Sequence, residues 1–251
     1  MLSTPVLKEH QMATLLPLGN SHDAACVHIR ELTMQACRVA YSSAGAVAEG
    51  IATGVTALLE TVRSREIELD RLDREIDSAV TTHITGTSEG SAREMLACMK
   101  LAISIERIGD LLLGFSNRAI VASTRCEMED IRDLTLMASR LEKMLFEIRE
   151  AFETRNLDRA LSVLRSDAEI DRLRNLVFVR HLDNPGGSHR SESFHVVFMT
   201  QALERAGDHV KNMAEEVCHL VSGQSVRHLL RSIDKPLEQM FLDQLRHKHA
   251  L

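Results

Sequence analysis

The strongest constraint on the fold of this chain is a long stretch without proline. The four prolines are Pro5, Pro17, Pro185 and Pro236, so 167 consecutive residues after Pro17 contain none. Proline breaks a helix because it lacks the backbone N–H and its ring clashes with the preceding turn. Hydrophobic residues make up 44% of the chain, but there are only seven Phe, one Tyr and no Trp, so the core must be mainly aliphatic. We therefore expect an all-α protein.

A five-residue motif occurs once in each half of the chain. ERIGD at 106–110 returns as ERAGD at 204–208. Each copy has two carboxylates four residues apart, a spacing that brings both to one face of an α-helix. Each copy also has a glycine inside a helix, which costs about 1 kcal/mol relative to alanine. Two unfavourable features at matching positions indicate a duplicated helical unit.

A second pair of acids precedes each motif. Glu66 and Asp70 are four residues apart, as are Asp167 and Asp171. These pairs begin 40 and 37 residues before the glutamate of their motif. The sequence therefore predicts two tandem, pseudo-symmetric three-helix bundles, each with four carboxylates on facing helices.

Turn-forming residues suggest where the helices end. We expect a 1–22 N-terminal arm, a three-helix repeat at 23–124, a second three-helix repeat at 125–224 and a helical tail at 225–251. The helices expected within the repeats span residues 23–52, 55–84, 91–122, 127–154, 157–182 and 191–221. In the second of these, Ile67, Leu72, Ile76 and Val80 form the expected apolar stripe.

The paired acids are the best candidates for a functional site. The first acidic seam consists of Glu66, Asp70, Glu106 and Asp110, and the second acidic seam consists of Asp167, Asp171, Glu204 and Asp208. Oxygen ligands alone suit magnesium, manganese or ferric iron, and zinc can bind bridging carboxylates. The alternative is that these acids are solvated and pair with neighbouring cations. Those neighbours are Arg71, Arg107, Arg172 and Arg205.

Other classes of function find little support. The net charge of −6 disfavours a nucleic-acid binder, and five scattered cysteines favour reduced thiols without a disulfide framework. No signal peptide and no apolar stretch of membrane-spanning length is expected. The chain has no GxSxG motif, P-loop or other catalytic constellation, so we expect no enzyme.

Two Glu-x-x-His pairs raise the alternative of a metal-storage bundle or a metal-dependent enzyme. The pairs are Glu192 with His195 and Glu216 with His219. A di-iron bundle needs such pairs on two different facing helices. Both pairs fall on the same expected helix, so we interpret them as surface pairs.

In these repeated motifs the chain resembles the PhoU family of phosphate-signalling proteins. The matching segments are IERIGD (105–110), LERAGDHVKNMAEEV (203–217), EIELD (66–70), DAEID (167–171) and LVSGQSVRH (220–228). The second motif is followed, four residues after its aspartate, by Asn212. The first copy has Gly114 in that place and departs from the pattern.

The resemblance implies two antiparallel three-helix bundles and a cytoplasmic regulator of phosphate uptake that represses the phosphate-starvation response. Its partners would be the ATPase of a phosphate ABC transporter and a membrane sensor histidine kinase, with a homodimer as the expected assembly. Some members carry multinuclear metal clusters on the acid-xxx-Asp motifs, which would add Asn212 to the second seam. The family has no established enzymatic activity.

Overall fold

In a computed structural model, every regular element in the described residues is an α-helix. The described residues are 19–122, 126–166, 168–182 and 190–223. The helices are α1 (Gly19–Thr53), α2 (Thr56–His83), α3 (Glu89–Ala122), α4 (Met128–Thr154), α5 (Leu157–Arg165), α6 (Ala168–Leu182) and α7 (Arg190–Ser222). The all-α prediction is confirmed. The expected arm at 1–18 and the tail from residue 224 onwards lie outside the described residues.

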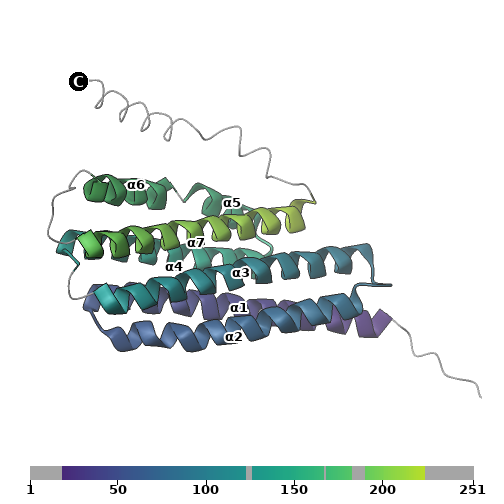
Figure 1. The fold of residues 1–251 in the computed structure, drawn as a ribbon. Coiled ribbons are helices and arrows are strands. Elements are labelled where there is room, and N and C mark those ends of the chain that lie inside the picture. Colours follow the sequence, from purple (N-terminus) through teal and green to yellow (C-terminus); the bar gives the residue numbers. More distant parts are fainter. Residues whose placement is uncertain (1–18, 123–125, 167, 183–189, 224–251) are drawn as a thin grey trace, which may run out of the picture.

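The helices form two bundles that lie side by side (Figure 1). Helices α1, α2 and α3 pack on one another, and α4 packs with α5, α6 and α7. Contacts of α3 with α7 and of α1 with α4 join the bundles. The Lys100–Glu216 ion pair and the stacking of Arg118 on Phe198 show that α3 and α7 are antiparallel. One layer thus contains α2, α3, α7 and α5/α6, with α1 and α4 behind it.

One prediction of helix length was wrong. The single helix expected at 157–182 is divided into α5 and α6, while the other five expected helices begin and end within a few residues of their predicted bounds. At the division, the Ser166 hydroxyl donates a hydrogen bond of 2.8 Å to the backbone oxygen of Val163. Serine competes in this way for backbone groups that would otherwise continue a helix.

The apolar face of α2 also differs from the prediction at one position. Ile67 is 61% exposed, whereas Leu69 is 2% exposed. Leu69 precedes the buried Leu72 and Ile76 by three and seven residues, which is the spacing of one helix face. Ile67 lies about 200° around the helix from Leu69, so it points towards solvent.

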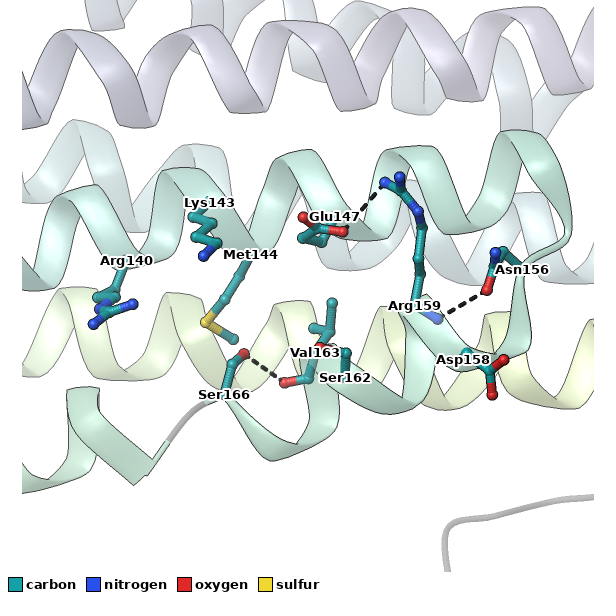
Figure 2. Close-up of a pocket in the computed structure, with 10 residues that line it drawn as sticks. All are labelled: Arg140, Lys143, Met144, Glu147, Asn156, Asp158, Arg159, Ser162, Val163 and Ser166. Carbon is teal, nitrogen blue, oxygen red and sulfur yellow. Dashed lines mark hydrogen bonds and ion pairs between the residues drawn. The ribbon is translucent and has the colours of Figure 1, made fainter.

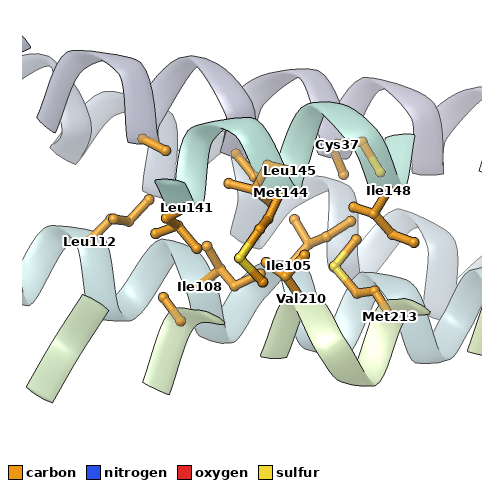
Figure 3. Close-up of a cluster of buried hydrophobic side chains, with 14 of the residues drawn as sticks. Cys37, Ile105, Ile108, Leu112, Leu141, Met144, Leu145, Ile148, Val210 and Met213 are labelled. Atoms are coloured by element: carbon orange, nitrogen blue, oxygen red, sulfur yellow. The ribbon is translucent and has the colours of Figure 1, made fainter. Parts of the chain in front are cut away.

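The two bundles share a single core. Buried side chains of α3, α4 and α7 meet where the bundles join (Figure 3). They include Ile105, Ile108 and Leu112 from α3, Leu141, Met144, Leu145 and Ile148 from α4, and Val210 and Met213 from α7. Burial raises the pKa of the Cys37 and Cys98 thiols to about 12, so both behave as unreactive core residues. Among the described helices, none has the length and apolar character that crossing a membrane requires.

Candidate functional site

The first acidic seam lies where α2 packs against α3. Helix α2 supplies Glu66 and Asp70, and α3 supplies Glu106 and Asp110. Gly109 allows this contact, because a Cβ atom there would lie 2.7 Å from Cδ1 of Leu69. The leucine therefore occupies the space that a larger residue would fill. Asp70 and Asp110 directly follow these two residues, so the contact brings them to the same level of the seam.

The carboxylates of the first seam interact across the two helices. Burial raises the pKa of Glu66, and the negative charges of Asp70 and Asp110 raise it further. Burial likewise raises the pKa of Glu106, with a second contribution from Asp110 and smaller ones from Asp70 and Asp73. Like charges in a partly desolvated place disfavour ionisation. The seam therefore carries negative charge that its surroundings do not fully balance.

One arginine partly neutralises this seam. Arg107 lies 3.2 Å from Asp110 (Nη1 to Oδ2) and 3.3 Å from Glu106 (Nε to Oε2), all on α3. The alternative of acids paired with a neighbouring arginine is thus realised at this position. Arg71, in contrast, forms its ion pair with Glu75, 2.5 Å away on the outer side of α2. A cation bound between Glu106 and Asp110 would have to displace Arg107.

The second acidic seam is described only in part, because Asp167 lies outside the described residues. Asp171 on α6 and the half-buried Glu204 and Asp208 on α7 are the members that the structure places. Glu204 lies 3.7 Å from Arg174 of α6, and Asp208 lies 2.8 Å from Lys211, one turn further along α7. Asn212 is exposed, one turn beyond Asp208.

The geometry of the seams sets a condition on metal binding. Among the described residues, no three Asp, Glu, His or Cys side chains converge on one point at which an ion could sit. The donor chemistry fits a hard cation, because every ligand would be an oxygen and the charge is unbalanced. The side chains must change rotamers, and Arg107 must leave, before several carboxylates can bind one ion.

The first seam has a further acidic member, Asp73, that the acid-xxx-Asp pairs do not include. Burial raises the pKa of Asp73 on α2, and the charges of Asp77 and Asp70 raise it further. Asp73 follows Asp70 by three residues, so it lies on the same face of the helix. This spacing is visible in the sequence and could have identified it.

A buried ionic cluster joins α4 to α6, and no sequence pattern predicted it. Asp130 and Asp133 of α4 have side chains only 3% and 2% exposed. Arg180 of α6 contacts Asp130 at 2.7 Å and Asp133 at 2.6 Å. His181 lies 3.1 Å from Asp130, and Arg132 lies 2.9 Å from Asp133. Burial alone would lower the pKa of Arg180, but hydrogen bonds to both aspartates raise it.

The two Glu-x-x-His pairs both lie on α7, as expected from the sequence. Glu216 forms an ion pair of 2.9 Å with Lys100 of α3, which ties it to the joint between the bundles. His209 is also half-buried, and burial together with the charge of Arg205 lowers its pKa. The interpretation as surface pairs is therefore wrong for Glu216, whose largely buried side chain serves a contact between helices.

These features define a class of protein: a helical protein of two bundles, with acid-xxx-Asp pairs on the facing helices α2 and α3 of the first bundle and on α7 of the second. The PhoU domain matches the chain twice, over residues 34–118 and 134–217. The first match lies within α1–α3 and the second within α4–α7. The chain belongs to the PhoU family.

Individual relatives agree with this assignment. A phosphate-specific transport system accessory protein PhoU homolog from Pseudomonas aeruginosa is 30% identical over 182 residues, covering 69% of this chain and 74% of that protein. A homolog of the same name from Caulobacter vibrioides is 28% identical over 174 residues, covering 67% and 76%.

Solved structures show the same fold. The crystal structure of PhoU from P. aeruginosa has a TM-score of 0.66 at 24% identity, over 82% of this chain and 97% of that one. The phosphate transport system regulatory protein PhoU from Streptococcus pneumoniae has a TM-score of 0.73 at 16% identity, over 82% and 99%. The prediction of two tandem PhoU-like bundles is confirmed.

Proposed function

We propose that this chain is an accessory protein of a phosphate transport system and regulates phosphate uptake. The observation that carries this proposal is the double match to the PhoU domain, which spans both bundles. Relatives named as accessory proteins of phosphate-specific transport support it. The chain acts through protein contacts and without catalysis. Its partners are the ATPase of a phosphate ABC transporter and a membrane sensor kinase, which it meets as a homodimer at the cytoplasmic face.

Deleting the gene tests this function. In high phosphate, the deletion should raise expression of an alkaline-phosphatase reporter and change phosphate uptake, and a plasmid copy should restore both. Pull-down with the tagged full chain should recover the transporter ATPase or the kinase. Normal uptake and normal reporter expression, together with recovery of neither partner, would refute the proposal.

The acidic seams have a second role in this proposal, as sites for a divalent or ferric ion. The raised pKa values of Glu66 and Glu106 support it, because a bound cation would relieve their mutual repulsion. When bound, such an ion would balance the charge of the seam. Glu66, Asp70, Glu106 and Asp110 would hold it in the first bundle. Asp167, Asp171, Glu204, Asp208 and, more weakly, Asn212 would hold it in the second.

Metal analysis of protein purified without chelator tests this role. Manganese or iron should raise the melting temperature of the parent, and a Glu66→Gln/Glu106→Gln variant should lose most of that increase. The matched control is Glu31→Gln/Glu49→Gln, which removes two exposed carboxylates of α1. Negligible metal content, with equal shifts in all three proteins, would exclude the seam as a metal site.

The alternative is a metal-dependent enzyme or storage bundle that uses the same carboxylates. An enzyme would need an open coordination position beside a group able to transfer protons. A storage bundle would bind many ions per chain, whereas a regulatory seam would saturate at a few. Titration of metal content against added iron distinguishes a storage bundle from a regulatory seam.

A further inference from the structure

A cleft lies between α4 and α5 in the second bundle (Figure 2). It has a volume of about 390 Å³, within the range of small-molecule sites. At about 30 Å³ per water molecule, this volume has room for roughly a dozen waters and exceeds what one inorganic phosphate ion needs. The buried Met144 and Val163 provide an apolar floor.

The walls of the cleft are two rows of polar side chains at helical spacing. Arg140, Lys143 and Glu147 lie three and then four residues apart on α4. Arg159 and Ser162 on α5 and Ser166, which directly follows α5, repeat the same spacing. The first and last residues of each row are seven positions apart, or about 10 Å along a helix. The cleft is therefore long enough for a ligand with anionic groups at separate places.

Cations gather in the cleft although the chain has a net charge of −6. Arg140 and Arg159 pair with Glu169 and Glu147, whereas Lys143 forms no ion pair with any of the described residues. Arg159 lies 3.3 Å from Glu147, and both side chains are partly exposed, so a ligand can exchange with this weak ion pair.

Arg140 has a donor that nothing in the described residues satisfies. Its Nη2 lies 2.5 Å from Glu169 of α6, but its Nε is buried and no acceptor among the described residues contacts it. A buried N–H group without an acceptor is unfavourable. Guanidinium groups match the oxygens of phosphate in a two-pronged manner, and the hydroxyl group of Ser162 can act as a further donor, whereas Ser166 already donates to Val163.

From this lining, we propose that the cleft between α4 and α5 binds an organic phosphate, a small molecule with a phosphate group and a less polar body that rests on Met144 and Val163. The cations recognise the phosphate oxygens. Ser166 of the lining directly precedes Asp167 of the second seam in the sequence, but the proposal does not depend on the proposed role in phosphate transport.

Calorimetric titration of the full chain with ADP, glucose 6-phosphate, pyrophosphate, inorganic phosphate and adenosine tests the proposal. At least one of the first two should bind with a Kd below about 1 mM. Inorganic phosphate should bind at least tenfold more weakly, and adenosine should not bind. Pyrophosphate tests whether the less polar body of the ligand contributes to affinity, because it carries phosphate charge without such a body. If pyrophosphate binds as tightly as ADP, the site recognises charge alone and the proposal is wrong.

Two matched variants locate the binding. Lys143→Ala/Arg159→Ala should weaken binding at least tenfold, whereas Arg30→Ala/Arg38→Ala, which removes two exposed cations of α1, should change it less than twofold. Circular dichroism of both variants checks that they fold. Absence of saturable binding by ADP and glucose 6-phosphate, or an equal loss in the two variants, would overturn the proposal.

Discussion

At the scale of single residues, Gly109 and Gly114 of α3 show how the same residue type serves different purposes. Gly109 is buried against Leu69 of α2, so its missing side chain is required by packing. Gly114 is half-buried, and a Cβ there would meet only Nη1 of Arg118, at 3.5 Å. In the first case glycine permits contact between helices. In the second it only weakens the helix.

We expect Gly109→Ala and Gly114→Ala to change stability in opposite directions. The first should destabilise the protein by about 1–2 kcal/mol, because overpacking against buried Leu69 outweighs the gain in helix propensity. The second should stabilise it by up to about 1 kcal/mol. Urea unfolding of both variants measures the difference. Equal stability of the two variants would show that Leu69 moves aside freely.

At the scale of elements, α6 depends on a tertiary tie to α4. Helix α6 is only 15 residues long, and its buried apolar side chains are Ile170, Leu173 and Val177. A short helix gains most of its stability from packing rather than from intrinsic propensity. The contacts of Arg180 with Asp130 and Asp133 therefore hold the C-terminal end of α6 against the first turn of α4.

Arg180→Gln should lower the free energy of unfolding by about 3 kcal/mol, since it leaves buried carboxylates without their main partner. Arg132 and His181 still contact those carboxylates, which places the loss at the lower end of the range for broken buried pairs. Adding Asp130→Asn and Asp133→Asn should recover much of the loss. Arg71→Gln, which breaks the exposed pair with Glu75, is the control and should cost less than about 1 kcal/mol. Similar losses in the free energy of unfolding from Arg180→Gln and Arg71→Gln would show that the contacts of Arg180 with Asp130 and Asp133 do not stabilise α6.

At the scale of the whole molecule, the shared core stabilises the fold against the repulsion within the first acidic seam. Side chains from α3, α4 and α7 form an apolar cluster between the bundles, and Leu69, Leu72 and Ile76 of α2 belong to the same core. Burial of this kind is the main favourable contribution to folding. It can therefore hold α2 and α3 together although their facing carboxylates repel one another.

The seam should make stability fall as pH rises. The pKa values of Glu66, Glu106 and Asp73 are raised in the folded chain, so the folded state binds more protons than the unfolded state above their ordinary values. Their stabilising contribution is fully present below the ordinary value of 4.5 for glutamate and is lost as pH rises through the raised values.

Glu66→Gln/Glu106→Gln should therefore be more stable than the parent near pH 7, by less than about 1 kcal/mol because water reaches both groups. The difference should vanish near pH 4, where the parent carboxyls are largely protonated. Urea titrations across this range measure it, with Glu31→Gln/Glu49→Gln as the control. A gain that persists unchanged at low pH would show that charge is not its cause.

Much of this protein could be predicted from its sequence, because the relevant signals are local. The absence of proline and the 3.6-residue periodicity predict helices, and the repeated acid-xxx-Asp spacing predicts the duplication and the acids of the first seam. Carboxylates four residues apart must share a helix face whatever the tertiary structure. Even Asp73, which was missed, lies in register with Asp70.

Other features were decided only when the helices packed. The packing of Leu69 against Gly109 and the pairing of Arg180 with Asp130 and Asp133 depend on contacts between segments far apart in sequence. Local periodicity specifies which side of a helix is apolar. It does not specify which helix lies against that side, at what angle, or which charges become buried together, and these choices created the ionic cluster and the cleft between α4 and α5.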